Sequence, residues 1–198
     1  MAKPFDIYLA SQSPRRRELL EQIGVNYQQI NVEVPEHPLD DEAPEVYVLR
    51  VALEKARAGQ ARLDEGESVP VLGADTAVVS QGDILGKPKD AEDAVATMIQ
   101  LAGEHHQVMS AVAMVGPDGE EHTRLSVSSV LFRPITLDEA RAYWESGEPA
   151  DKAGGYAIQG KGAVFVERLE GSYSGVMGLP LFETAELLQA FGISLLKR

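Results

Sequence analysis

The fold is indicated by the stretch Phe5-Asp6-Ile7-Tyr8-Leu9-Ala10-Ser11-Gln12-Ser13-Pro14-Arg15-Arg16-Arg17, in which an apolar run leads through a short polar turn into a helix start. The apolar residues 5–10 predict a buried strand. Ser13 is a favourable N-cap and Pro14 a favourable first helical residue, and the amphipathic segment that follows stops at Gly24. This part of the chain therefore predicts a strand, a tight turn and a helix.

The first turn of that helix carries three consecutive arginines. This arrangement is locally unfavourable, because the helix dipole favours negative charge at a helix N-terminus. A bound anion would remove the conflict, since exposed backbone N–H groups, a serine hydroxyl and forked guanidiniums then converge on one ligand. We therefore expect Ser13, Arg15 and Arg16 to bind a phosphate chain. The alternative is a capped surface helix whose arginines project into water.

The composition limits the classes of partner and of chemistry. The 198 residues include 31 acidic and 18 basic side chains, and the formal net charge of -13 disfavours a DNA or RNA backbone as partner. A single nucleotide is still allowed, because it needs only a local basic pocket. The chain has no cysteine, which excludes disulfides and thiolate chemistry. It shows neither a secretory segment nor a run near the ~20 apolar residues of a membrane span, so a cytoplasmic protein without a membrane partner is expected.

Strands and helices mix along the chain without strict alternation, which predicts an α/β architecture with a mixed, twisted sheet. No linker divides residues 1–198, so a single domain is expected. Residues 107–115 and 122–132 predict an antiparallel hairpin. His105 and His106 lack a partner at metal-ligand spacing and are interpreted as surface residues. The other predicted strands cover residues 27–34, 69–79 and 163–169, and the other predicted helices begin at Pro44, near Asp90, at Thr136 and at Pro180.

Asp75 is the best candidate for a reactive carboxylate. It interrupts the apolar strand predicted over residues 69–79, where an unpaired charge is costly. A carboxylate held in such a place can act as a general base or as a metal ligand. The alternative is a strand end or bulge at Gly73, with Asp75 capping a turn. Thr76 adds a hydroxyl beside it.

Two lysines and three acids complete the set of charged candidates. Lys87 lies in a tight loop made rigid by a following proline and could reach a phosphate, although loop lysines are usually just solvated. Lys55 lies near the end of a long helix, where favourable interaction with the helix dipole is the simpler explanation. Glu33 is the first candidate for a metal ligand, and Glu36 and Asp151 are the next.

The glycine-rich segment Gly155–Gly162 nearly matches a P-loop, but Gly162 replaces the magnesium-binding hydroxyl residue and the segment leads into a strand instead of a helix. A P-loop is therefore rejected. The segment contains one amide side chain, Gln159. A glutamine amide offers a donor and an acceptor and can pair with the edge of uracil or thymine. A bond to its own loop backbone is the alternative.

Taken together, five motifs resemble the Maf family of nucleoside triphosphate pyrophosphatases, in the order of that family and across almost the whole chain. They are Ser11-Gln12-Ser13-Pro14-Arg15-Arg16, Gly73-Ala74-Asp75-Thr76, Gly86-Lys87-Pro88, Asp151-Lys152-Ala153-Gly154-Gly155-Tyr156-Ala157-Ile158-Gln159-Gly160, and Gly171-Ser172-Tyr173 through Gly178-Leu179-Pro180.

The resemblance implies hydrolysis of a nucleoside triphosphate between its α and β phosphates, with a divalent cation, Mg²⁺ or Mn²⁺. It implies that Asp75 accepts a proton from water and that Arg15, Thr76 and Gln159 select the substrate. The metal is expected at Glu33 and Asp75, and the polyphosphate at Ser13, Arg16, Lys55 and Lys87. The family fold implied is an elongated α/β structure of the inosine triphosphatase-like kind, with two lobes, a central cleft and commonly a homodimer.

The form Ile158-Gln159-Gly160 is similar to the branch of the family that acts on dTTP and UTP, in contrast to the branch associated with 7-methyl-GTP. We therefore expect an enzyme that hydrolyses dTTP and UTP, with CTP or modified pyrimidine nucleotides as further candidates, and that removes unwanted nucleotides. Two alternatives stay open from the sequence. One is a regulator of cell division that senses nucleotides without hydrolysing them, and the other is a pyrophosphatase for modified purine nucleotides.

Overall fold

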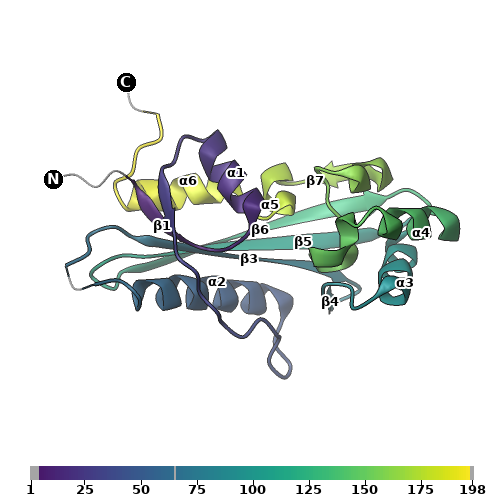
Figure 1. The fold of residues 1–198 in the computed structure, drawn as a ribbon, viewed down its shortest axis with the longest axis horizontal. Helices are drawn as coiled ribbons and strands as arrows, with labels where there is room; N and C mark the ends of the chain where they lie inside the picture. The colour runs from purple at the N-terminus through teal and green to yellow at the C-terminus, as the bar shows by residue number, and fades with distance from the viewer. Residues whose placement is uncertain (1–4, 65, 197–198) are drawn as a thin grey trace.

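A computed structural model describes residues 5–64 and 66–196 and shows an elongated molecule in which helices cover both faces of a seven-stranded sheet (Figure 1). This confirms the predicted mixed α/β fold. The strands are β1 (Ile7–Ala10), β2 (Tyr27–Gln29), β3 (Val71–Ser80), β4 (Asp83–Leu85), β5 (His105–Val115), β6 (Glu121–Phe132) and β7 (Val166–Glu170). The α-helices are α1 (Pro14–Gln22), α2 (Pro44–Gln60), α3 (Ala91–Leu101), α4 (Leu137–Glu145), α5 (Tyr173–Met177) and α6 (Leu181–Ala190), and three 3₁₀ turns are η1 (Glu148–Asp151), η2 (Ala153–Gly155) and η3 (Lys161–Phe165).

The sheet is mixed, with the strand order β2-β1-β3-β5-β6-β7 and with β4 paired to β3. β1 is parallel to both β2 and β3, whereas the remaining pairs are antiparallel. The predicted hairpin is confirmed, because β5 and β6 pair along their whole length from Val115↔Glu121 to His105↔Leu131. All seven strands belong to one sheet, and the single domain expected over residues 1–198 stays a prediction.

One edge of β3 is open over its middle residues. β5 pairs with the other edge from Val71 to Val79, so β1 and β4 share the edge that β5 leaves free. β1 reaches only as far as Gly73, and β4 begins only at Val78. Among the described residues no strand pairs with residues 74–77 along that edge, and Asp75 and Thr76 lie in this gap.

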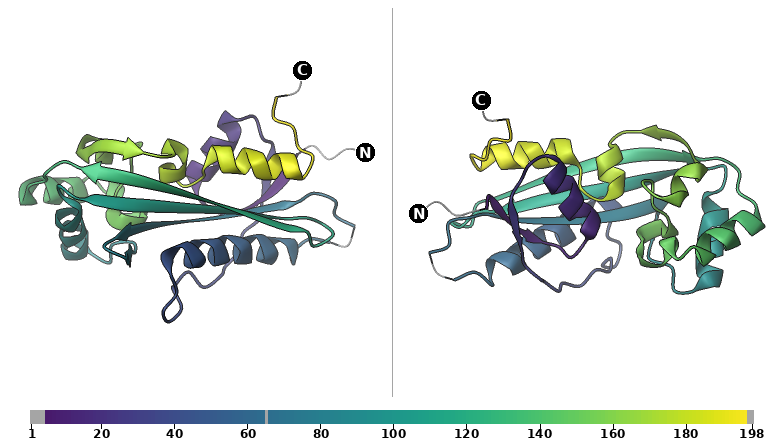
Figure 2. Two further views of the ribbon diagram at one scale, coloured as in Figure 1. Left: turned by 180° about the vertical axis from the view of Figure 1, so that it is seen from behind. Right: turned by 45° about the horizontal axis from the view of Figure 1, so that its top comes forward.

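Helix α2 covers one face of the sheet, and α1, α5 and α6 cover the other, while α3 and α4 lie at the far end (Figures 1 and 2). A cluster containing Val48, Val51 and Ala77 fills the α2 side, and a cluster containing Leu20, Leu72 and Leu187 fills the opposite side. In the described part of the chain no helix is both long and apolar enough to cross a bilayer.

The strand predicted over residues 27–34 is wrong beyond Gln29, because β2 pairs only with β1, which ends at Ala10. The apolar alternation of residues 30–34 has another cause. Val32 and Val34 pack against two different core clusters from an extended, unpaired segment. This segment continues into the acidic loop and brings Glu33 to the open edge of β3.

The strand predicted over residues 163–169 begins later than expected. Residues 161–165 form the 3₁₀ turn η3, and β7 occupies Val166–Glu170, where it pairs with the end of β6. The side chain of Phe165 turns into the core against Phe132 and Tyr143, which holds this part of the segment in the turn.

Gly73 allows α2 to lie directly on β3. A Cβ atom at this position would collide with the backbone of Ala52 and would come within 2.6 Å of the amide nitrogen of Ala56. Because backbone atoms cannot move aside as a flexible side chain can, any side chain here must push the helix away from the strand.

We predict that Gly73→Ala lowers the free energy of unfolding by about 1–3 kcal/mol through overpacking. The control is Gly86→Ala, since apart from the glycine and its two chain neighbours no described atom lies within 4 Å of the added Cβ, and the backbone there does not have a positive φ. That variant should change the same quantity by less than about 1 kcal/mol. Urea denaturation followed by circular dichroism measures both, and equal values for the two variants would contradict this account of the packing.

Candidate active site

A cavity of about 490 Å³ opens at the unpaired edge of β3, a size typical of small-molecule sites. Each element that meets this edge contributes to the wall: the β1–α1 turn, α2, the extended segment after β2, the loop after β4, the glycine-rich segment and the end of α5. The cavity brings together all of the site residues that the sequence predicted, namely Ser13, Arg15, Arg16, Glu33, Lys55, Asp75, Thr76, Lys87 and Gln159.

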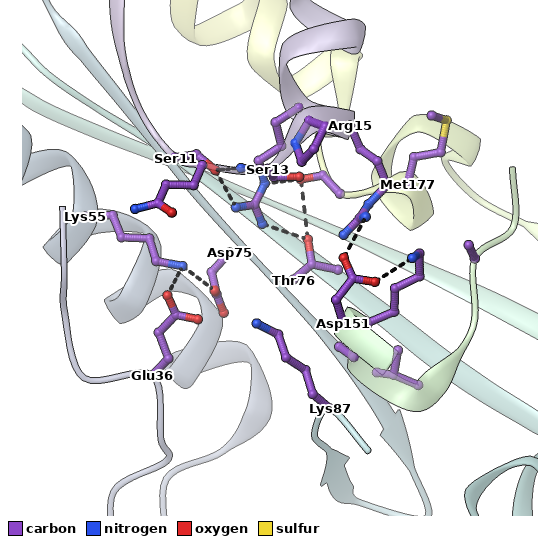
Figure 3. A pocket seen from close by; sticks show the side chains of 18 of the residues that line it. Ser11, Ser13, Arg15, Glu36, Lys55, Asp75, Thr76, Lys87, Asp151 and Met177 are labelled. Carbon is purple, nitrogen blue, oxygen red and sulfur yellow. Dashed lines mark hydrogen bonds and ion pairs between the residues drawn. The ribbon is translucent and has the colours of Figure 1, made fainter. Parts of the chain in front are cut away.

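Asp75 and Thr76 are neighbours on β3 and therefore point to opposite faces of the sheet. Asp75 is directed towards α2, where it meets Lys55, and Thr76 is directed towards α1 and α5, where it meets Arg16 (Figure 3). Because no strand in the described part of the chain covers this stretch of the β3 edge, one cavity reaches both side chains. The open edge thus brings the acidic and the basic part of the site together.

Asp75 is 5 % exposed, and its carboxylate is held by one lysine. Lys55 Nζ donates to Asp75 Oδ1 at 2.9 Å and also lies 2.9 Å from Glu36 Oε1. The second carboxylate oxygen, Oδ2, is buried without a hydrogen-bond partner among the described residues. Asp75 lies inside β3 with both neighbours paired to β5, so the alternative of a strand end or turn cap is wrong.

Burial raises the pKa of Asp75 above its ordinary value, because desolvation outweighs the attraction of Lys55 and Arg16. Glu36 behaves in the opposite way. Burial alone would raise its pKa, but the hydrogen bond and charge of Lys55, with help from Lys87 and Arg16, lower the pKa of Glu36 below the ordinary value. Asp75 is therefore the more basic carboxylate of the two that share the lysine.

The arginine end of the cavity is built around Arg16, which is 9 % exposed. Its Nε donates to the carbonyl of Gly178 at 2.8 Å, its Nη1 to Ser11 Oγ at 3.1 Å and its Nη2 to Thr76 Oγ1 at 3.4 Å. Arg15 is half-buried and forms a long ion pair of 3.8 Å with Asp151. Arg16 is therefore fixed by three elements, so the alternative in which it projects into water is wrong.

Ser13 occupies the N-cap position of α1, but its side chain does not cap the helix. The hydroxyl of Ser11 takes a related role, because it accepts from the Ser13 N–H at 3.2 Å as well as from Arg16. The predicted N-cap position is therefore confirmed, although the side-chain hydrogen bond that usually goes with it is not formed. Ser13 instead presents its side chain at the cavity wall.

Lys87, Gln159 and Glu33 are exposed residues at the rim of the cavity. Lys87 reaches in from the loop after β4 and approaches the site from the side opposite the arginines (Figure 3). Among the described residues it makes no hydrogen bond or ion pair, so its ammonium group is available to a ligand. Lys55, in contrast, lies buried in the site, so its place near the end of α2 does more than complement the helix dipole.

The chain matches the family model described as Maf-like protein over residues 6–191. This chain belongs to the Maf family. It is 58 % identical over 190 residues to the dTTP/UTP pyrophosphatase of Alkalilimnicola ehrlichii, a match that covers 94 % of this chain and 93 % of the relative. It is 54 % identical over 189 residues to the dTTP/UTP pyrophosphatase of Saccharophagus degradans, covering 95 % of this chain and 90 % of the relative.

The fold is shared with a more distant protein. The crystal structure of the nucleoside-triphosphatase, dITP/XTP pyrophosphatase, from Mycobacterium abscessus aligns with a TM-score of 0.50 and 19 % sequence identity over 93 % of each chain. This likeness confirms the inosine triphosphatase-like architecture expected of the Maf family.

Several parts of this Maf site carry no clear signal in the sequence. The motifs contained Ser11 and Gly178, but nothing indicated that the hydroxyl of one and the carbonyl of the other hold Arg16. Glu36 was only one of several acids, and its pairing with Lys55 depends on how the loop before α2 folds back. Ser110, which bonds Thr76, gave no signal beyond being a serine in an apolar strand.

His106 is not the surface residue that the sequence predicted. It is 2 % exposed, its Nε2 lies 2.8 Å from the hydroxyl of Tyr156, and its ring packs edge-on against Phe132. Burial lowers the pKa of His106 to about 4, so it is neutral at pH 7. Tyr156 lines the cavity, so this histidine supports the wall from behind. His105 is exposed as predicted.

We predict that Asp75→Asn raises the melting temperature at neutral pH. The pKa of Asp75 in the folded protein lies above its ordinary value, so ionisation of this carboxyl group opposes folding. The contribution of Asp75 to the free energy of unfolding therefore falls as the pH rises from the pKa of the unfolded state towards that of the folded state. Asparagine cannot ionise. The difference in melting temperature between the variant and the wild type should therefore grow from pH 4 to pH 8 in thermal denaturation. A variant that is less stable by the same amount at every pH would contradict the raised pKa.

Proposed function

We propose that this chain is a nucleoside triphosphate pyrophosphatase that hydrolyses dTTP and UTP to the monophosphate and pyrophosphate. One observation carries the proposal: the Arg16 guanidinium and the Asp75 carboxylate line the same cavity at the open edge of β3. Relatives more than half identical to this chain over nearly all of its length are named dTTP/UTP pyrophosphatase. By hydrolysing such nucleotides the protein would remove unwanted nucleotides from the cellular pool.

The cationic groups suit a triphosphate. The start of α1 offers backbone N–H groups together with Arg15 and Arg16, and Lys87 approaches from the opposite wall. Phosphoryl transfer is catalysed chiefly by positioning and by stabilising charge on oxygens, so converging cations do more for it than a covalent nucleophile would. Lys55 adds a further positive charge beside Asp75.

Asp75 is the proposed general base. Its Oδ2 atom is buried without a hydrogen-bond partner among the described residues, and the raised pKa makes this carboxylate a stronger base than an exposed aspartate. Lys55 holds Oδ1, and the backbone of Asp75 is fixed in β3, so Oδ2 keeps one orientation in the cavity. In this proposal Asp75 Oδ2 accepts the proton of the water that attacks the α-phosphorus.

A divalent cation fits the residues present. The carboxylates of Asp75, Glu33 and Glu36 border one cavity, and carboxylate oxygens are the ligands that Mg²⁺ and Mn²⁺ prefer. In the described part of the chain no three acidic or histidine side chains form a ready-made cluster, so substrate phosphates would complete the ligand set. Glu33 and Asp75 are the proposed protein ligands. When bound, the cation would neutralise charge on the phosphates.

Arg15, Thr76 and Gln159 are proposed to select the nucleotide. Gln159 is exposed at the cavity rim, where its amide can present a donor and an acceptor to the edge of thymine or uracil. CTP and modified pyrimidine nucleotides are included as candidate substrates. A homodimer, a cytoplasmic location and the absence of nucleic-acid and membrane partners stay predictions.

The test is pyrophosphate release from dTTP, UTP, CTP, dGTP and 7-methyl-GTP in the presence of Mg²⁺ or Mn²⁺. We expect dTTP and UTP to be hydrolysed fastest and Asp75→Asn to lower kcat by about 10²–10⁴-fold, as loss of a general base does. The control is Asp138→Asn, because that carboxylate is 96 % exposed on α4 and pairs only loosely with Arg141. Binding of dTTP without pyrophosphate release would indicate a nucleotide sensor and would contradict the proposal.

A further inference from the structure

We infer that Ser110 is a positioning residue that sets the orientation of the Thr76 hydroxyl and, through it, of the Arg16 guanidinium. Ser110 lies on β5, is 1 % exposed and is absent from the cavity wall. The inference rests on the proposed function in so far as Arg16 binds the polyphosphate of a nucleotide.

A row of hydroxyls crosses the sheet behind the arginine end of the site. Thr76 on β3, Ser110 on β5 and Ser126 on β6 are partners in register, so their side chains point to the same face. The oxygens of Thr76 and Ser110 are 2.7 Å apart. Ser110 Oγ also lies 2.6 Å from the carbonyl oxygen of Gly175 in α5.

The direction of each hydrogen bond in this row follows from the number of hydrogens. A carbonyl oxygen can only accept, so the single hydroxyl hydrogen of Ser110 goes to Gly175. Thr76 must then be the donor in the short contact with Ser110, which leaves the lone pairs of Thr76 Oγ1 for other donors. One of these donors is Arg16 Nη2 at 3.4 Å.

Without Ser110 the Thr76 hydroxyl would have a competing partner. The carbonyl of Gly178 lies 3.4 Å from Thr76 Oγ1, and it already accepts from Arg16 Nε at 2.8 Å. A Thr76 hydroxyl that turned towards this carbonyl would compete with the guanidinium for the same oxygen. Ser110 prevents this by offering Thr76 a closer acceptor.

Helix α5 does not depend on Ser110 alone. Ser128 Oγ accepts from the backbone N–H of Ser172 at 2.9 Å, and Ser174 Oγ accepts from that of Leu181 at 3.0 Å. These bonds tie the start of the helix to β6 and to the start of α6. Loss of the Ser110–Gly175 bond should therefore leave α5 in place, and the main effect should pass through Thr76.

The experiment compares Ser110→Thr with Ser110→Val, which have nearly the same volume and differ in the hydroxyl. We measure kcat and KM for dTTP and the Kd of inorganic tripolyphosphate by calorimetry. The valine variant should raise KM and Kd by about fivefold and change kcat by less than about twofold, because binding of the polyphosphate is weakened. The threonine variant should stay within about twofold of the wild type.

A double-mutant cycle distinguishes positioning from a general loss of packing. In a Thr76→Val background the row of hydroxyls is already broken. The ratio of KM, and that of Kd, between the valine and threonine variants at position 110 should therefore shrink to less than about twofold. Ser126→Ala is the matched control, since it removes a buried hydroxyl from the same row beyond Ser110 and should leave KM and Kd within about twofold. If the larger side chains prevent folding, as a melting curve would show, Ser110→Ala replaces the valine variant and is compared with the wild type.

Equal constants for the threonine and valine variants, or an undiminished difference in the Thr76→Val background, would overturn the inference. Failure of the proposed function has a separate signature. A wild-type protein that binds tripolyphosphate but releases no pyrophosphate from dTTP would contradict the hydrolytic function, and the binding constants would still decide the role of Ser110. A wild-type protein that binds no tripolyphosphate would overturn both.

Discussion

The site depends on one constraint, which is that a buried carboxylate must be held at an unpaired strand edge. Asp75 can stay on β3 because Lys55 of α2 lies 2.9 Å from it, and Lys55 can approach so closely because Gly73 lets the helix backbone rest on the strand. A carboxylate buried without such a partner would be strongly destabilising. The local chain of contacts from Gly73 through α2 to Asp75 therefore links packing of the sheet to the chemistry of the site.

The open edge explains how one small cavity combines groups from both faces of a sheet. β1 stops at Ala10 and turns into α1, which places the arginines next to residues 74–77 of β3, where that edge is unpaired among the described residues. The two faces then carry different tasks. The α2 face holds the proposed base, and the α1 face holds the cations proposed to bind phosphate. The overall charge of -13 does not oppose this, because the cationic groups are concentrated locally.

Much of this arrangement could be predicted from the sequence, because its signals are local. The strand, turn and helix at the N-terminus, the β5–β6 hairpin and the candidate residues all follow from short patterns of apolar, capping and charged residues. The site could not be assembled from those patterns, since the distance between Asp75 and Arg16 depends on where β1 ends. Residues 30–34 show why local patterns are not enough, because their alternation reflects packing of Val32 and Val34 in a segment that pairs with no strand of the described chain. His106 and Ser110 depend in the same way on partners more than thirty residues away, Tyr156 and Thr76.

In the proposed arrangement a nucleotide's polyphosphate lies between the arginine end of α1 and Asp75, with the attacking water on the side of Asp75 and aimed at the α-phosphorus. Hydrolysis of dTTP in water labelled with oxygen-18, followed by mass spectrometry of both products, tests this most directly. If the water attacks the α-phosphorus, the label enters the nucleoside monophosphate and none enters the pyrophosphate. Label in the pyrophosphate would place the attack on the β-phosphorus and would contradict the proposed position of Asp75 relative to the substrate.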